Sequence, residues 1–187
     1  DGSSNFGSNK QFNPTWSAGA AWHIGEEAWM KKALPALSHA TLRAAYGFTG
    51  DVNTSTSHLL VIQYLQQQYR YFGDETFNLG TIPSAPNPDL GWEKTQDAKA
   101  GLDFGLWKDR LTLNTEYYYR LSTDVVTSSP VQSTTGFTHV YFNAADIMNS
   151  GIELTLNGKI IQTKDWGLSA AVNFAYNYNK VLKYNPA

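Results

Sequence analysis

Apolar and polar residues alternate along most of this chain, and the clearest alternation lies within residues 87–126. In its first half the apolar set is Ala98, Ala100, Leu102, Phe104 and Leu106. In its second half the apolar set is Leu111, Leu113, Tyr117, Tyr119 and Leu121. Successive side chains of a β-strand point to opposite faces, so this period predicts two strands, each with one apolar face. The short polar break between them predicts a β-hairpin.

The break at Lys108-Asp109 constrains the register of this hairpin. Even-numbered apolar residues precede the break and odd-numbered ones follow it, so each cross-strand pair must join an even number to an odd one. A two-residue loop, which pairs Trp107 with Arg110, satisfies this rule, and a four-residue loop keeps the same register. A three-residue loop would turn one arm to the wrong face. The allowed register predicts an ion pair between Asp97 and Arg120.

The same alternation recurs along the chain and predicts an all-β antiparallel meander. We expect its strands at about residues 14–25, 41–49, 93–107, 110–126, 149–161 and 166–180. Acidic residues precede lysines in 26–34, which predicts a short helix ended by Pro35. Two long polar segments, 50–91 and 127–148, are predicted to be loops. Short and long connections therefore alternate, with the short turns at one end of the sheet.

The composition favours strands that have one face in lipid and the other in water. Aromatic residues make up 14% of the 187 residues, and charged residues make up 16%, below the ~25% of ordinary soluble domains. Trp166 and Tyr176 share a face about ten residues apart, which is ~33 Å of strand, or ~25 Å of height when the strand is tilted. That height matches the apolar band of an outer-membrane barrel, so we predict transmembrane strands.

The exposed faces suggest three groups of candidate residues. Aromatics at the membrane interface are predicted to be Trp16, Trp22, Trp166, Tyr176 and Tyr178. Charges that line a wet lumen are predicted to be Asp97, Lys99, Asp103, Glu116, Arg120, Glu153 and Lys159. Loop aromatics that could contact a ligand or a lid protein are Tyr64, Tyr69, Tyr71, Phe72, Phe137, Tyr141 and Phe142. The alternative for the loop aromatics is packing of one loop against another.

Several functional classes receive no support from the sequence. The net charge of -2 gives no basic excess for binding nucleic acid. Without cysteine, neither a disulfide framework nor a thiolate metal site is expected. The four histidines lack metal-ligand spacing, and no nucleophile motif is visible, so we predict no enzyme, metal or cofactor. The remaining alternative to a membrane barrel is a soluble aromatic-rich β-domain that binds carbohydrate, although strands in soluble sandwiches are usually shorter.

Six strands are too few to close, because the smallest membrane barrels have about eight strands. The chain must therefore assemble with other chains or form a segment of a larger barrel. Its motifs occur in a characteristic order: Asp1-Gly2-Ser3-Ser4, Asn87-Pro88-Asp89-Leu90, Trp92-Glu93-Lys94-Thr95 and Gly151-Ile152-Glu153-Leu154. In this order they resemble the SusC/RagA family of TonB-dependent outer-membrane transporters. Ala145 departs from the family, which usually has glycine there.

The resemblance implies a later segment of a barrel of about 22 strands that is filled by an amino-terminal plug. Such a barrel lies in the outer membrane of a Gram-negative bacterium and imports glycans or peptides. It works with a SusD-like surface lipoprotein as a lid and with TonB, which acts through the plug. The plug, the TonB-contacting segment and the signal peptide are expected outside these residues. Residues 50–91 and 127–148 are expected to face outward, and the short turns the periplasm.

Overall fold

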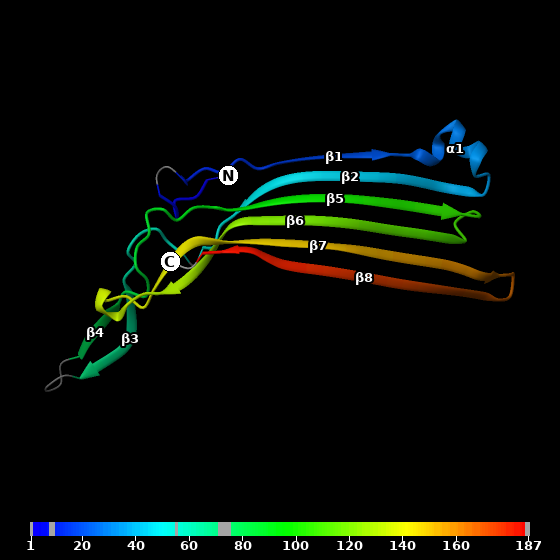
Figure 1. The fold of residues 1–187 in the computed structure, drawn as a ribbon. Coiled ribbons are helices and arrows are strands. Elements are labelled where there is room, and N and C mark those ends of the chain that lie inside the picture. Colours follow the sequence, from blue (N-terminus) through cyan, green and yellow to red (C-terminus); the bar gives the residue numbers. More distant parts are fainter. Residues whose placement is uncertain (1, 8–9, 55, 71–75, 186–187) are drawn as a thin grey trace.

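Six long strands form one antiparallel sheet in the computed structural model, which describes residues 2–7, 10–54, 56–70 and 76–185 (Figure 1). Their order in the sheet is β1-β2-β5-β6-β7-β8. The bounds are β1 Trp16–Trp22, β2 Leu37–Asp51, β5 Glu93–Leu106, β6 Leu111–Pro130, β7 His139–Gln162 and β8 Gly167–Tyr184. The predicted six-stranded antiparallel meander is confirmed, with its short turns gathered at one end of the sheet.

The predicted helix between the first two strands is also present. A 3-10 turn, η2 Ile24–Glu26, precedes the helix α1 Ala28–Ala33. The strand β1 ends at Trp22, whereas the sequence predicts a strand to residue 25. The apolar–polar alternation continues past Trp22, but the residues from Ile24 onward form the 3-10 turn. Across the described ranges, no helix is long and apolar enough to cross a bilayer.

Both predicted long loops prove to be more ordered than the sequence indicated. Within 50–91, β3 Gln63–Arg70 and β4 Thr76–Thr81 form a separate two-stranded sheet. Their residues are mostly polar, so no apolar alternation marks them. Within 127–148, strand structure fills both ends, and only residues 131–138 connect β6 to β7, with η3 Ser133–Thr135 between them. The prediction of a loop over 127–148 is therefore wrong at both ends.

A bulge explains why the strand residues within 127–148 were predicted to be loop. The pairing of β6 with β7 shifts register between Ser122 and Val125, and again after Val125. Asp124 lies inside this shift and has a positive φ of 58°. Each extra residue changes the phase of the side-chain alternation, so a search for a constant period of two loses both strands at this point. Beyond it the pairing continues to Pro130 opposite His139.

The register of the central hairpin is confirmed. Asp97 pairs with Arg120, and the pairing runs without a shift to Leu106 opposite Leu111. Four residues lie between the two strands, although the tight turn itself is centred on Lys108-Asp109. Both of these residues have positive φ, 58° and 59°, as a primed hairpin turn requires.

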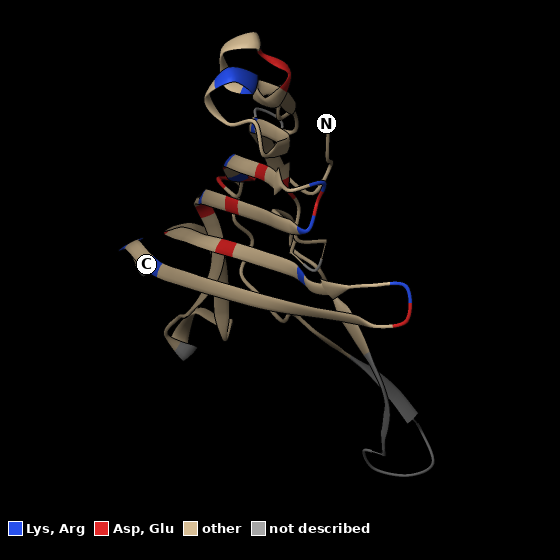
Figure 2. Cartoon of the chain, turned by 90° about the vertical axis from the view of Figure 1, so that its right-hand side faces the viewer, with Lys and Arg blue, Asp and Glu red and all other residues tan. Residues whose placement is uncertain are grey.

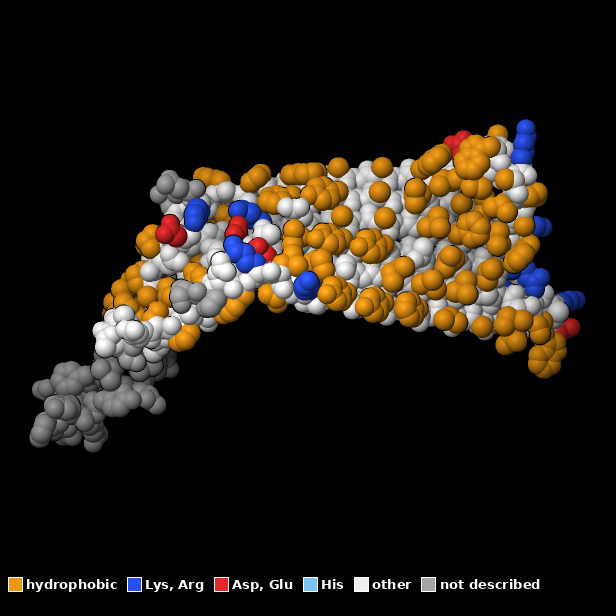
Figure 3. Space-filling view, viewed as in Figure 1, with side chains coloured by type: hydrophobic (Ala, Val, Ile, Leu, Met, Phe, Trp, Pro, Cys, Tyr) orange, Lys and Arg blue, Asp and Glu red, His pale blue; other side chains and the backbone are white. Residues whose placement is uncertain are grey.

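This register places the apolar sets of all six strands on one face. One row across the sheet is Ala20, Ala44, Ala100, Tyr117, Ile152 and Tyr176. Figure 3 shows hydrophobic side chains spread over this face from the turn end toward the loop end. Large members such as Val172 and Phe174 remain 57% and 55% exposed. An apolar surface this extensive requires cover from lipid or another protein.

A small buried core lies at the loop end instead of beneath the sheet. Phe6, Leu90 and Trp92 form it, and Val52, Val126 and Tyr141 pack against it. The rings of Phe6 and Trp92 meet at a centroid distance of 5.2 Å. The core therefore joins the amino-terminal segment to the start of β5 and positions the loop-end residues described below.

Candidate functional site

The polar face of the sheet carries a series of ion pairs. Arg120 Nη2 lies 2.5 Å from Asp97 Oδ2, and Lys99 Nζ lies 3.8 Å from Glu116 Oε1. These side chains remain 23% to 50% exposed, so each pair contributes only ~0–1 kcal/mol to stability. Their main effect is a wettable wall with fixed charge positions.

Arg43 is a member of this wall that the sequence analysis missed. Its Nε lies 2.9 Å from Asp103 Oδ2, and its Nη2 donates a hydrogen bond of 3.2 Å to Asp103 Oδ1. Two parallel bonds of this kind fix the orientation of the guanidinium. The sequence did carry a signal that Arg43 belongs to the polar face, because it lies between the apolar residues Leu42 and Ala44 in a predicted strand.

Glu153 and Lys159 lie on the same face but belong to no ion pair within the described ranges. Glu153 is directly opposite Glu116, so two carboxylates face each other across β6 and β7. Like charges in this position repel, and Lys99 beside Glu116 offsets part of the repulsion. The structure thus places all seven predicted wall charges on one face and pairs five of them.

Glycines let large polar side chains lie flat against this wall. Tyr118 is opposite Gly151, and its hydroxyl reaches across to donate a hydrogen bond to Asn177 Oδ1. A Cβ at Gly151 would lie 2.7 Å from the Tyr118 hydroxyl and 2.6 Å from the Tyr176 carbonyl oxygen. Both distances are too short for a side chain. Glycine here therefore keeps Tyr118 along the sheet and out of the space in front of it.

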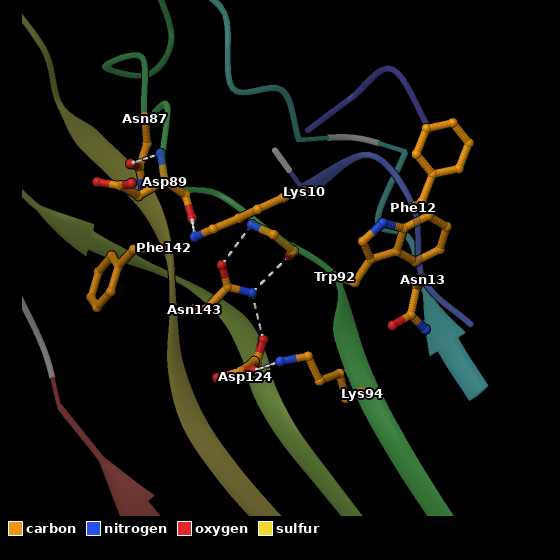
Figure 4. Close-up of a pocket in the computed structure, with 11 residues that line it drawn as sticks. Lys10, Phe12, Asn13, Asn87, Asp89, Trp92, Lys94, Asp124, Phe142 and Asn143 are labelled. Atoms are coloured by element: carbon orange, nitrogen blue, oxygen red, sulfur yellow. Dashed lines mark hydrogen bonds and ion pairs between the residues drawn. The ribbon is translucent and has the colours of Figure 1, made fainter. Parts of the chain in front are cut away.

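A cavity of about 470 Å³ lies at the loop end, where four segments of the chain meet (Figure 4). Its lining residues are Lys10, Phe12, Asn13, Asn87, Asp89, Gly91, Trp92, Lys94, Asp124, Phe142 and Asn143. Lys10 Nζ donates a hydrogen bond to the Asp89 carbonyl oxygen. Lys94 Nζ lies 2.7 Å from Asp124 Oδ2 and closes another side.

Asn143 holds the cavity together through three hydrogen bonds. Its Oδ1 accepts the Gly91 N–H at 2.8 Å, and its Nδ2 donates to the Gly91 carbonyl at 2.8 Å and to the Asp124 carbonyl at 2.6 Å. One side chain thus satisfies backbone groups from the approach to β5 and from the bulge of β6. The sequence analysis missed Asn143 because it placed this residue in a loop, and no local pattern marks its partners.

Glu93 lies at the loop end of β5, beyond the apolar band. Its Oε1 accepts the Val126 N–H at 2.9 Å, and it is paired with Asp51 in the sheet. Burial raises the pKa of Glu93 above its ordinary value. The hydrogen bond from Val126 acts in the opposite direction on this pKa, and the negative charge of Asp51 raises it further.

The predicted loop aromatics do not form one cluster. Tyr64 is 71% exposed on the β3–β4 hairpin, whereas Phe137 and Phe142 are half-buried near the start of β7. Tyr141 packs against the loop-end core, as the loop-packing alternative expects, and meets His139 edge-on at 5.1 Å. Tyr69 belongs to β3, but its side chain lies outside the described part. Tyr71 and Phe72 also lie outside the described residues.

The predicted interface aromatics lie toward the two ends of the apolar face and along β8. Trp16 contacts Tyr46 at the loop end of β1, with ring centroids 5.5 Å apart. Trp22, at the other end of β1, donates a hydrogen bond of 3.1 Å from Nε1 to Glu27. Trp166 is 78% exposed in the β7–β8 turn. Tyr176 and Tyr178 lie along β8, in the apolar rows of Ile152 and Ser150.

Comparison with known proteins places this architecture in a family. Residues 1–187 match the family model described as TonB dependent receptor-like, beta-barrel. The chain is 34% identical over 98% of its length to the TonB-dependent receptor SusC of Bacteroides thetaiotaomicron. It is 31% identical over 98% of its length to the TonB-dependent receptor P3 of Formosa agariphila. It spans only 18% of the length of each relative.

Solved structures agree with this placement. The RagAB peptide importer in its closed-closed state superposes with a TM-score of 0.79 and 31% identity, over 97% of this chain and 19% of that chain. The RagAB peptide transporter gives the same TM-score over 98% of this chain. By their own names these relatives are TonB-dependent receptors and a peptide importer. The chain therefore belongs to the TonB-dependent receptor family, as a six-stranded segment of an outer-membrane β-barrel of the SusC/RagA type.

Proposed function

We propose that this chain is part of the barrel wall of an outer-membrane importer of glycans or peptides. The observation that carries the proposal is the match over nearly the whole chain to SusC and to the RagAB peptide importer, at 34% and 31% identity. The sheet has the two faces that this role requires. One face is apolar and exposed, and the other carries ion pairs such as Asp97 with Arg120.

In this proposal the polar face lines the lumen. The wall charges are Arg43, Asp97, Lys99, Asp103, Glu116, Arg120, Glu153 and Lys159. Their exposure keeps the wall hydrated, and the flat Tyr118 leaves room in front of it. The short turns face the periplasm and the loop end faces outward, as in other outer-membrane barrels. The predicted interface aromatics then lie at the two membrane interfaces; they are Trp16, Trp22, Trp166, Tyr176 and Tyr178.

The partners follow from the same placement. A SusD-like surface lipoprotein contacts the loop end as a lid, and TonB supplies energy through a plug that fills the complete barrel. The β3–β4 hairpin supports the lid contact, since it extends away from the main sheet at the loop end (Figure 1). Its exposed Tyr64 is suited to contact another protein, because tyrosine combines a large apolar ring with a polar tip.

The loop-end residues are the candidates for ligand contact. Phe137 and Phe142 are half-buried aromatics, and the cavity beside Phe142 also presents Asn87, Asn143 and Asp89. Aromatic rings stacked beside amide and carboxylate groups suit either a sugar ring or a peptide backbone. Tyr69, Tyr71 and Phe72 remain predicted ligand or lid contacts.

Growth and uptake measurements test the proposal. A strain lacking the complete receptor is compared with its parent on defined glycans and on defined peptide mixtures as the sole nutrient. We expect lost growth on one of these classes and restored growth when the receptor is returned. Uptake of labelled cargo should also require energy coupling. Unchanged growth and uptake on every glycan and peptide would contradict an import function.

The lid contact needs a separate measurement. The complete receptor is purified with an affinity tag, and co-purified surface lipoprotein is quantified. Tyr64→Ala on the hairpin should reduce the recovered lipoprotein, whereas Tyr117→Ala on the apolar face is the matched control and should not. Equal recovery with both variants would remove Tyr64 from the lid interface.

A further inference from the structure

Another cavity lies at the turn end of the sheet, on the polar face and far along the strands from the loop-end cavity. It measures about 470 Å³, and its lining includes Arg110, Thr112, Asn157, Lys159 and Ser169. Thr112 pairs with Asn157, and Lys159 pairs with Ser169, so these side chains share one face of β6, β7 and β8. The cavity is therefore a feature of the polar wall and not of the lipid-facing surface.

Two cations face each other across this cavity. The Lys159 N–H donates a hydrogen bond of 2.7 Å to the Arg110 carbonyl oxygen, which extends the pairing of Leu111 with Gly158 by one residue. Side chains that lie directly opposite start ~4.5–5.5 Å apart at their Cβ atoms, and like charges in this position destabilise a sheet. An anion bound between the two side chains would relieve this repulsion.

Neither cation has a carboxylate partner among the residues that the structure describes. On the same face, Glu116 and Glu153 lie ~20 Å further along β6 and β7. Asp109 also lines the cavity, but its Oδ1 lies 2.9 Å from His39 Nδ1 on β2. Its carboxylate is therefore turned toward β2, whereas the Arg110 guanidinium is turned toward β7. The cavity keeps an excess of positive charge.

Backbone carbonyl groups hold the Arg110 guanidinium in place. Its Nη2 donates a hydrogen bond of 3.1 Å to the Ile160 carbonyl oxygen, and Nε and Nη2 each lie 3.4 Å from the Lys159 carbonyl oxygen. These bonds orient the group without neutralising its charge. Within the described ranges Nη1 has no hydrogen-bond partner, so its N–H donors are available to a ligand.

We propose that this cavity binds a carboxylate group carried by the cargo, an inference that rests on the proposed import function. The carboxylate lies between Arg110 and Lys159 and accepts charge-assisted hydrogen bonds from both. Asn157 and Ser169 add an amide and a hydroxyl to the lining for polar groups beside the carboxylate. Acidic sugars and acidic peptides share the carboxylate, so the site recognises the charge of the cargo.

The position of the cavity gives the site its place in the import path. Figure 2 turns this end of the sheet toward the viewer and shows Lys and Arg in the helix and at the turns. With the turn end toward the periplasm, the cavity lies at the exit of the lumen. Both Arg110 and Lys159 are exposed, so salt screens their charges and bound cargo can leave.

Equilibrium binding to the complete receptor, purified in detergent, tests the inference. Two matched pairs of probes are titrated: trigalacturonate with uncharged galactotriose, and triglutamate with triglutamine. We expect the acidic member of at least one pair to bind about tenfold more tightly, because charge-assisted hydrogen bonds contribute this much. The pair with the larger ratio identifies a sugar or a peptide as the source of the carboxylate. Equal binding within both pairs would overturn the proposal.

Variants assign this acid preference to the cavity. Arg110→Gln combined with Lys159→Gln should abolish it. Lys108→Gln combined with Lys164→Gln is the matched control, because it removes the same charge from two turns at the same end, outside the lining. The control should keep the preference. A preference that survives the first pair of substitutions, or that is lost equally with the second, would contradict the assignment.

Charge reversal supplies a test in which the site is filled from within. Lys159→Glu puts a carboxylate opposite Arg110, in the arrangement that Asp97 and Arg120 already have. The acid preference should then vanish, while heat-dependent gel mobility shows that the barrel is intact. A preference retained by this variant would show that the cargo carboxylate binds elsewhere. Binding is measured without transport, so failure of this inference and failure of the import function are seen separately.

Discussion

Asp97 on β5 lies directly opposite Arg120 on β6, and the two side chains meet at 2.5 Å between Oδ2 and Nη2. The other carboxylate oxygen, Asp97 Oδ1, is buried without a hydrogen-bond partner among the described residues. The ion pair therefore supplies the principal contact of this carboxylate. A double-mutant cycle with Asp97→Asn and Arg120→Gln should give a coupling of ~0.5–1 kcal/mol in urea unfolding of the complete receptor.

Salt provides the control for this pair. The coupling should fall when the salt concentration is raised, because both side chains are partly exposed and ions screen them. The same cycle on Lys99 and Glu116, which are 3.8 Å apart, should give a smaller coupling. A coupling near zero at low salt would mean that the Asp97–Arg120 pair is a geometric feature without energetic weight.

The two faces predict opposite responses to the same substitution. Leu154 lies on the apolar face near the middle of β7, and Leu154→Arg should cost ~2–4 kcal/mol because it places a charge in lipid. Glu153→Arg is matched in depth but lies on the polar face opposite Glu116, so it should cost little or stabilise the barrel. Urea unfolding in vesicles measures both. Equal penalties would show that the face assignment is wrong.

Asn143, which is half-buried, should stabilise the loop end through its hydrogen bonds. Asn143→Ala removes three hydrogen bonds and leaves backbone groups of Gly91 unpaired, which should cost ~1–3 kcal/mol. Asn143→Asp keeps the acceptor for the Gly91 N–H and loses both donated bonds. We expect hydrogen exchange of the Gly91 amide to rise strongly in the first variant and less in the second. Equal exchange in both would contradict the orienting role of Oδ1.

The loop-end core predicts a contrast between two phenylalanines of the same segment. Phe6 is 1% exposed and Phe12 is 83% exposed. Phe6→Ala should destabilise the packing by ~3–5 kcal/mol and release the amino-terminal segment, whereas Phe12→Ala should have little effect. Limited proteolysis near residues 2–13 measures the release. Similar cleavage of the two variants would show that the core does not hold this segment.

Glu93 predicts a dependence of stability on pH. Its pKa in the folded state is raised, so its contribution to stability is fully present below the ordinary carboxyl pKa and is lost as the pH rises through the raised value. Glu93→Gln keeps an acceptor for the Val126 N–H and cannot ionise. At neutral pH the variant should therefore be at least as stable as the parent, and the difference should shrink in acid. Thermal unfolding at several pH values measures this difference.

Part of the candidate site was predictable because it depends on short-range patterns. The positions of Asp97, Lys99 and Asp103 on one face follow from the alternation within one strand, and their pairing with β6 follows from the short turn at Lys108-Asp109. Arg43 is separated from Asp103 by the entire 50–91 segment, so its pairing required knowledge of which strands are neighbours. Asn143 similarly reaches Gly91 from a different strand, across a bulge that the period does not reveal.

The sequence by itself determined the meander, the two faces of each strand and the register of the central hairpin, because all three depend on the period of two and on turn length. Only the tertiary structure decided where β6 and β7 extend past the bulge at Asp124, which residues pair across β2 and β5, and how Asn143 closes the loop-end cavity. Those features arise from hydrogen bonds between segments far apart in the chain. A bulge shifts the side-chain phase without a local signal, so only the partner strand fixes its position.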